Sequence, residues 1–338
     1  METGSVGIKN RTETQSIVEK TDLHQNLQDR FNESFAKVFN GGKPKISVDI
    51  FYSPHDTPED MRGLSDQLKQ TDVYIPEAFS WNRRVLSMLR DVSSGEIDPG
   101  KLSRRIRRNY SGVFRNSLEE IYDSKKAITL VDVRSDAKLR TESDGAWDYL
   151  PSLDGSFAEA LNYTKTFVSN LSSYIARRED YILSQVTPRK IKELIEQYPW
   201  LRDKKEIKIL LSLGSGHAPM PDDFSRTSFT DEAIIKSKLG EQISDDLASK
   251  VFLENFLDTI LLGQFSTSRY WLTKDTKKIV RLKRIIIGQL NYQDAQRIFD
   301  YCKSNRFFPR SEFERIFKEK SIIFPENEKE LDELLAKS

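Results

Sequence analysis

Four short apolar segments, separated by helical patterns, constrain the fold of this chain more than any other feature. They are residues 46–52 (ISVDIFY), 73–75 (VYI), 127–133 (AITLVDV) and 207–213 (IKILLSL). Apolar residues at helical spacing lie between and around them, at residues 58–69, 79–94, 101–124, 154–186 and 190–198. Strands that alternate with helices usually pair in parallel, because a parallel neighbour needs a crossover connection. The sequence therefore predicts an α/β fold, a mostly parallel sheet with helices on both faces.

The rest of the chain predicts two flanking regions. Residues 1–40 are polar and show helical spacing only towards their end. Beyond residue 232 the pattern is almost entirely helical, at residues 232–262, 275–287, 291–304 and 309–320, before an acidic tail that starts at Glu326. We expect a polar, partly helical N-terminal segment (1–40), an α/β domain (41–231) and an all-helical C-terminal subdomain or cap (232–338).

Charge and cysteine content exclude several classes of protein. The chain has 53 Lys and Arg against 52 Asp and Glu, so no whole-protein field attracts nucleic acid or an anionic membrane. Cys302 is its single cysteine, which excludes a disulfide framework and a cysteine-rich zinc site. The N-terminal residues are polar, and no apolar run approaches the ~20 residues that span a bilayer. These features predict a cytoplasmic protein with no membrane contact and no clear nucleic-acid partner.

Histidine is scarce, which narrows the chemistry. Only His24, His55 and His217 are present. Ligands of open α/β sheets bind beyond the carboxyl ends of the strands. His55 follows the first apolar segment, Glu77 ends the second, and His217 lies in the GSGH turn after the fourth. We expect His55, Glu77 and His217 to lie close together at this edge of the sheet. A loop or capping role for each histidine is the simpler alternative.

A charged residue interrupts the apolar face of the helix predicted at residues 154–186. That face is formed by Phe157, Leu161, Thr164, Val168, Leu171, Ile175, Ile182 and Val186. Arg178 fills the step between Ile175 and Ile182. An isolated buried charge is very unfavourable, so Arg178 should face a carboxylate or an anionic ligand; a structural ion pair or a guanidinium that reaches solvent are the alternatives. Asp132, near the end of the third segment, could serve only nearby backbone amides.

The remaining motifs give little information about function. The basic segments at residues 101–115 and 274–284 could contact phosphates, but their spacing favours the solvated faces of helices. Walker A, GxGxxG, GxSxG and HExxH motifs are absent from the sequence, so nucleotide-binding and serine-hydrolase signatures are missing.

Residues 46–220 resemble the TraB/Tiki family, whose wider relatives include erythromycin esterase-like and ChaN-like proteins. That family has two GxxH motifs, a strand-terminal glutamate after the first, and an arginine on a later helix. Here YSPH (52–55) matches the first motif with Tyr52 in place of glycine, and GSGH (214–217) matches the second. Glu77 ends DVYIPE, Arg178 lies in ARREDYI, and VDVR around Asp132 is similar to an internal strand of the family.

The resemblance implies a hydrolase that cleaves a peptide, ester or lactone bond, resembling a metallopeptidase or an esterase. His55, Glu77 and His217 would hold one divalent metal ion, such as Mn, Co or Zn, or would act directly as base and acid. Arg178 would orient Glu77 or stabilise an oxyanion. The alternatives are a non-catalytic protein that holds a peptide, haem or other small ligand in the same pocket, or a helical protein whose C-terminal helices contact a partner.

Overall fold

The computed structural model describes residues 29–33, 45–53, 61, 63–106, 112–143, 153–218, 224–263, 273, 275–305 and 310–337. Its strands are β1 (Lys45–Ser53), β2 (Val73–Ile75), β3 (Ala127–Ile128) and β4 (Glu206–Gly214). Within the described residues they form one sheet in the order β1-β4-β2-β3, and every pair is parallel. The predicted α/β fold is confirmed.

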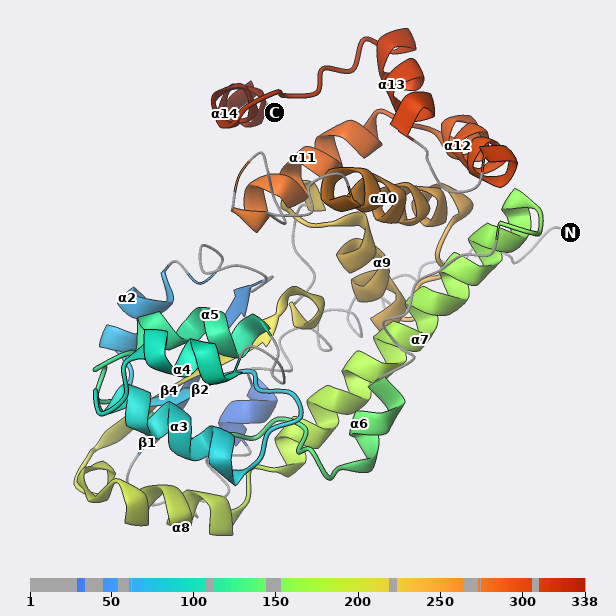
Figure 1. Cartoon of the computed structure of the whole chain (residues 1–338). Coiled ribbons are helices and arrows are strands. Elements are labelled where there is room, and N and C mark those ends of the chain that lie inside the picture. The colour runs from blue at the N-terminus through green and yellow to red at the C-terminus, as the bar shows by residue number, and fades with distance from the viewer. Residues whose placement is uncertain are drawn as a thin grey trace, which may run out of the picture.

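Helices surround this sheet and continue beyond it (Figure 1). Those before β4 are α2 (Leu64–Lys69), α3 (Arg83–Ser93), α4 (Pro99–Ile106), α5 (Gly112–Ile121), α6 (Lys138–Ser143), α7 (Phe157–Ser184) and α8 (Pro188–Gln197). Those after it are α9 (Phe229–Lys238), α10 (Asp245–Gly263), α11 (Thr276–Gly288), α12 (Tyr292–Asn305), α13 (Arg310–Glu319) and α14 (Glu328–Lys337). Short 3-10 turns occur at Pro199–Leu201, Ser215–His217 and Phe224–Arg226.

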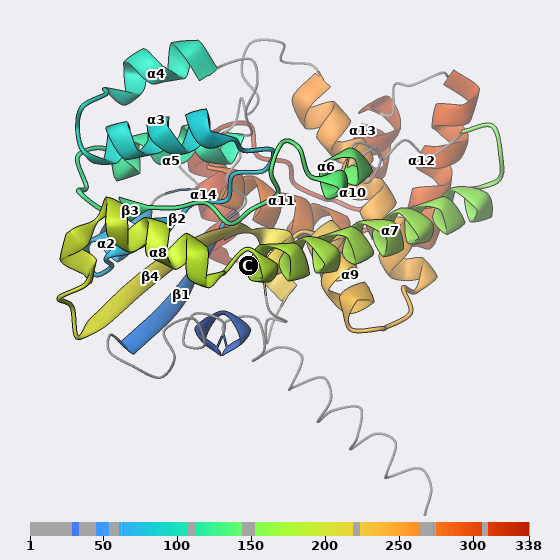
Figure 2. The same ribbon diagram turned by 90° about the horizontal axis from the view of Figure 1, so that it is seen from below.

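The two faces of the sheet have separate apolar cores, because successive side chains of a strand point to opposite faces. Leu210 of β4 packs with α2, α3, α4 and α5 on one face. Its neighbours Ile209 and Leu211 pack with α7 and α8 on the other. Figure 2 shows α3, α4 and α5 together on one side of the strands. Coverage of both faces explains why the strands read as nearly continuous apolar runs.

The edge strand β3 is shorter than its apolar run predicts. Only Ala127 and Ile128 pair with β2 in the sheet, and four residues later the Asp132 carboxylate accepts a hydrogen bond from the Ala78 amide at 3.0 Å. Side chains cover the outer edge: Arg90 donates to the Ile128 carbonyl (3.2 Å) and Lys190 to the Leu130 carbonyl (2.6 Å). Tyr198 Oη accepts from the Ile128 amide at 3.3 Å. Such covering blocks the pairing of another strand at this edge.

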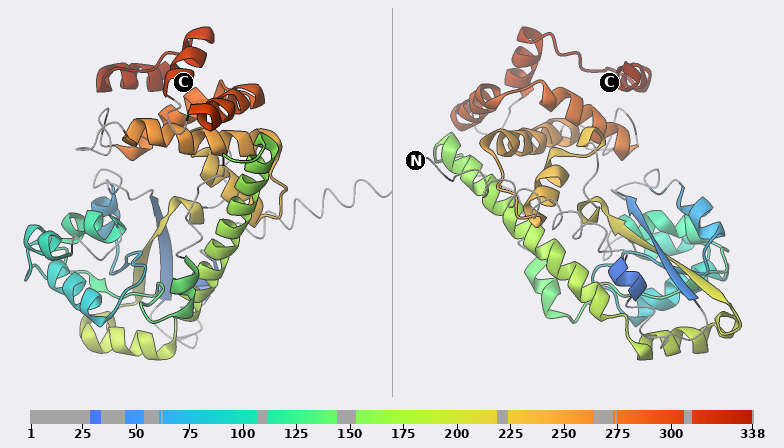
Figure 3. Two further views of the ribbon diagram at one scale, coloured as in Figure 1. Left: turned by 45° about the vertical axis from the view of Figure 1, so that its right-hand side comes forward. Right: turned by 180° about the vertical axis from the view of Figure 1, so that it is seen from behind.

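A third apolar core joins the C-terminal helices to the first part of α7. It contains Phe157 and Ile175 of α7 together with residues of α9 to α14, whereas Ile182 near the end of α7 packs under the sheet. Both views in Figure 3 show α7 as a long diagonal between the sheet and the C-terminal helices. Its start is fixed by a capping box, in which Ser156 and Glu159 satisfy each other's backbone amides.

Two features of the C-terminal region differ from the sequence pattern. The helix expected at residues 232–262 is interrupted, since α9 ends at Lys238 and Gly240 adopts a positive φ of 74°. That conformation is typical of the residue after a helix end. The acidic tail forms α14, which buries Leu331 and Leu335. No helix in the described part of the chain combines the length and apolar character needed to cross a membrane.

Candidate functional site

The strand order brings part of the predicted site to one edge of the sheet. Glu77 lies two residues after β2, and His217 ends the 3-10 turn that follows β4. Because β2 and β4 are parallel neighbours, both residues lie beyond the carboxyl ends of adjacent strands. His55 lies outside the described residues, so its approach to the other two stays a prediction.

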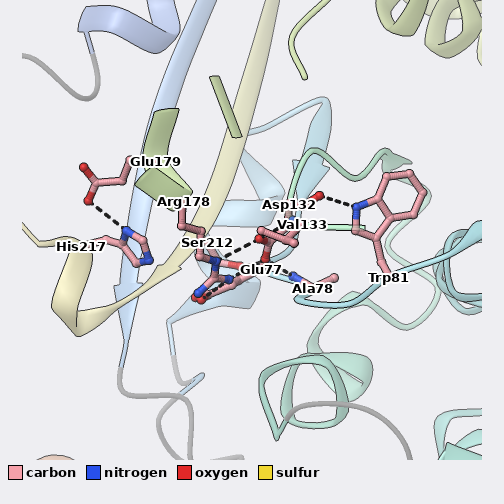
Figure 4. A network of polar contacts seen from close by, with 9 residues as sticks. All are labelled: Glu77, Ala78, Trp81, Asp132, Val133, Arg178, Glu179, Ser212 and His217. Atoms are coloured by element: carbon pink, nitrogen blue, oxygen red, sulfur yellow. Dashed lines mark hydrogen bonds and ion pairs between the residues drawn. The ribbon is translucent and has the colours of Figure 1, made fainter. Parts of the chain in front are cut away.

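Glu77 is held by a buried arginine. Arg178 Nη2 lies 2.6 Å from Glu77 Oε1 and 2.6 Å from Asp132 Oδ2, and its Nε donates to Asp132 Oδ1 at 3.0 Å. The side chains of Arg178, Glu77 and Asp132 are only 7%, 7% and 3% exposed. We call these three residues the Arg178 cluster (Figure 4). The expectation that Arg178 faces a carboxylate is confirmed.

Hydrogen bonds with backbone and side-chain groups fix both carboxyl-bearing residues of this cluster. Asp132 accepts from the amides of Ala78 (3.0 Å) and Val133 (2.6 Å), and its carbonyl accepts from Trp81 Nε1 at 2.6 Å. The amide of Glu77 donates to Ser212 Oγ of β4 at 3.2 Å. Asp132 therefore accepts hydrogen bonds from nearby backbone amides, as one of the sequence predictions states, and it also neutralises the charge of Arg178.

Electrostatics favour the charged form of Arg178. Burial by itself would lower the pKa of its guanidinium, but the carboxylates of Asp132 and Glu77 outweigh burial and raise that pKa above its ordinary value. Removing either carboxylate would leave more of this charge uncompensated in a region that excludes water. The cluster is therefore a tightly coupled unit.

His217 belongs to a second buried network. Glu179, the residue next to Arg178 on α7, is its central carboxylate. His217 Nδ1 lies 2.9 Å from Glu179 Oε1, and Lys238 of α9 donates to the same oxygen at 2.6 Å. The His217 side chain is 3% exposed. We call His217, Glu179 and Lys238 the His217 network. In Figure 4 the other ring nitrogen, Nε2, points away from Glu179 and to the side where Arg178 and Glu77 lie.

The charge of Glu179 affects its neighbours and is set by them. Burial would raise the pKa of Glu179, but the hydrogen bonds and charges of His217 and Lys238 hold it below its ordinary value. Burial first, and the Glu179 charge second, raise the pKa of Tyr52, so this phenol stays protonated. Tyr52 is the residue that replaces the glycine of the first GxxH-like motif.

The GSGH turn brings His217 against α7 by a close approach of the backbone. A Cβ added at Gly216 would lie 3.1 Å from Ile175 Cδ1, which is tighter than an ordinary contact. Glycine at this position therefore lets the turn lie on α7, one helical turn before Glu179.

Sequence reasoning missed Glu179 and Lys238. Glu179 follows Arg178 directly and sits on a helix whose buried face is wide, since Ile175, Arg178, Glu179 and Ile182 are all buried. A second charged residue beside the apolar stripe was the available signal. Lys238 gives no such signal, because it lies far along the chain at the end of α9.

The described residues do not by themselves fit a metal centre. The carboxylate of Glu77 is bound to the Arg178 guanidinium, which would repel a cation placed beside it. Nowhere in the described ranges do three or more His, Cys, Asp or Glu side chains form a group that could hold a metal ion. A metal site would have to include side chains outside the described residues, such as that of His55.

Comparison of the chain with protein-family models, with curated proteins and with solved structures finds no match in any of the three. The chemistry open to this chain therefore has to be inferred from its own residues and their geometry.

Proposed function

We propose that this protein is a hydrolase in which His217, oriented by Glu179, activates water to cleave a peptide, ester or lactone bond. The observation that carries the proposal is the 2.9 Å contact between His217 Nδ1 and the buried Glu179 carboxylate. A carboxylate on one ring nitrogen fixes the tautomer that leaves the other nitrogen unprotonated and able to accept a proton. Sequence resemblance to the TraB/Tiki family points to the same class of reaction.

In this proposal Nε2 of His217 takes a proton from water as the water oxygen attacks the carbonyl carbon. Glu179 stabilises the imidazolium that forms, and Nε2 then returns the proton to the leaving group. Lys238 holds the Glu179 carboxylate in place. Glu77, positioned by Arg178 at the neighbouring strand end, supplies a second carboxylate. Arg178 is a positioning residue, because its contacts with Glu77 and Asp132 commit its guanidinium to carboxylates.

The test is a hydrolysis panel with the purified full chain: p-nitrophenyl esters, a lactone and a quenched fluorescent peptide mixture. Each is assayed with EDTA and with added Mn²⁺, Co²⁺ or Zn²⁺. We expect turnover of one substrate class, and a loss of about 100-fold or more in the His217→Asn variant. The matched control is Arg177→Gln, an exposed change on α7. Equal turnover by wild type and His217→Asn would overturn the proposal, and absence of turnover by the wild type on every substrate would overturn it in favour of a binding protein.

The assays with EDTA and with added metal ions distinguish direct activation of water by His217 from activation by a bound metal ion. Activity that survives EDTA supports direct catalysis by His217 and Glu179. Activity that requires an added metal, and is lost in both His55→Ala and His217→Asn, would replace direct base catalysis by the metal-dependent form of the proposal.

A further inference from the structure

A groove of about 1240 Å³ lies outside the site described above. It runs along α3 and α8 and past the segment after β3, beside the covered edge of the sheet. None of its described lining residues belongs to the Arg178 cluster or the His217 network. Its volume exceeds the ~300–1,000 Å³ that is usual for small-molecule sites.

Cations from three elements line the groove. Among the described lining residues these are Arg83 and Arg90 of α3, Arg134 after β3, and Arg189 and Lys190 of α8. Arginine suits phosphate oxygens, because its planar fork donates two parallel hydrogen bonds. The starts of α3 and α8 add the positive ends of two helix dipoles.

In the described part of the chain, five cations and four carboxylates line the groove, the carboxylates being those of Asp91, Asp136, Glu193 and Glu196. Asp136 pairs with Arg134 (3.0 Å) and Glu193 with Arg189 (3.0 Å), both at exposed positions. Arg90 and Lys190, by contrast, donate to the backbone carbonyls of Ile128 and Leu130. Their charges therefore meet neutral acceptors at the sheet edge.

Lys190 lies among these charged groups, and burial is the main influence on its pKa. Its Nζ lies 4.6 Å from the centre of the Trp81 ring, and both residues line the groove. Burial lowers the pKa of Lys190 to about 8; Glu193 opposes this change, and the nearby charges of Arg134 and Arg90 add to it. An anion placed among these groups would relieve the repulsion and favour the protonated lysine.

We propose that this groove binds a small molecule that carries a diphosphate or two neighbouring phosphates. The cations come from both walls and from the segment between them, which suits a ligand with several negative oxygens better than a single carboxylate. The site is independent of the hydrolytic reaction proposed above.

The test is titration of the full chain with inorganic pyrophosphate by isothermal calorimetry, with sodium sulfate at equal ionic strength as the reference. We expect saturable binding that sulfate does not reproduce, weakened about tenfold in Arg134→Gln. The controls are Arg84→Gln and Lys192→Gln, exposed neighbours on α3 and α8 that do not line the groove. Absence of saturable binding, or equal affinity in wild type and Arg134→Gln, would overturn the proposal.

Proton uptake gives a second readout. At pH 8, titrations in buffers of different ionisation enthalpy should show that the wild type takes up protons on binding pyrophosphate, because the ligand raises the Lys190 pKa from about 8. Lys190→Gln should lose that uptake, and Lys192→Gln should keep it. Uptake that persists in Lys190→Gln would contradict the role of Lys190 in the groove.

Discussion

Adjacent residues of α7 anchor two buried networks that differ in what they connect. The Arg178 cluster joins α7 to the segments that follow β2 and β3, and so lies within the α/β part of the chain. The His217 network joins α7 to the turn after β4 and to Lys238 of α9. In the first, a guanidinium is committed to carboxylates. In the second, Nδ1 of the His217 ring contacts the Glu179 carboxylate, and Nε2 points away from that carboxylate. The first is suited to stability and positioning, and the second to proton transfer.

The largest predicted effect is on the Arg178 cluster. Arg178→Met should lower the free energy of unfolding by about 3–5 kcal/mol, because it leaves the carboxylates of Glu77 and Asp132 buried without their cation. Urea denaturation of the full chain measures this change. The exposed control, Arg177→Met, should alter the same quantity by less than about 0.5 kcal/mol. Similar losses in the two variants would show that Arg178 has no special structural role.

A smaller effect is expected in the His217 network. Glu179→Gln should lower the free energy of unfolding at neutral pH by about 1–3 kcal/mol, since charge-assisted hydrogen bonds to His217 and Lys238 become weaker.

The pH dependence of that loss has a definite sign. The pKa of Glu179 is lowered in the folded state, so its stabilisation is present above its ordinary value of 4.5 and is lost as the pH falls through the lower folded value. Wild type and Glu179→Gln should therefore converge in stability below that range. A difference that stays constant between pH 7 and pH 3 would contradict the assigned ion pairs.

The smallest change in unfolding free energy is expected at the start of α7. It tests whether the stability of this helix end affects the two networks. Ser156→Ala removes the N-cap of α7, about 20 residues before both networks, and should cost about 1 kcal/mol of unfolding free energy. It should leave turnover and the acid dependence of stability unchanged. Thermal and urea unfolding, together with the hydrolysis panel, test this expectation, and a loss of turnover without unfolding would show that the site depends on the far end of α7.

The fold was predictable because its signals are local. The run 73–75 coincides with β2, and the runs 46–52 and 207–213 lie one residue inside each end of β1 and β4. Arg178 was predictable for the same reason, since a charge on an apolar helical stripe stands out. The shortness of β3 was not, because the apolar run 127–133 continues past Ile128 and carries no local signal for the point where pairing with β2 ends.

The contacts between the site residues were less predictable than the identity of those residues. The spacing of strands and turns indicates Glu77 and His217, but it does not show that Glu179, rather than Glu77, contacts His217 Nδ1. That pairing depends on the rotation of α7 against the turn after β4. Lys238 depends on how α9 packs on α7, which no local pattern encodes.

The most direct test of the account is the kcat/KM of Glu179→Gln on the best substrate from the hydrolysis panel. If Glu179 orients His217 for proton transfer, kcat/KM should fall by about 100-fold or more, with most of the change in kcat. A kcat/KM equal to that of the wild type, in a folded Glu179→Gln variant, would contradict the assignment of the His217 network as the catalytic site.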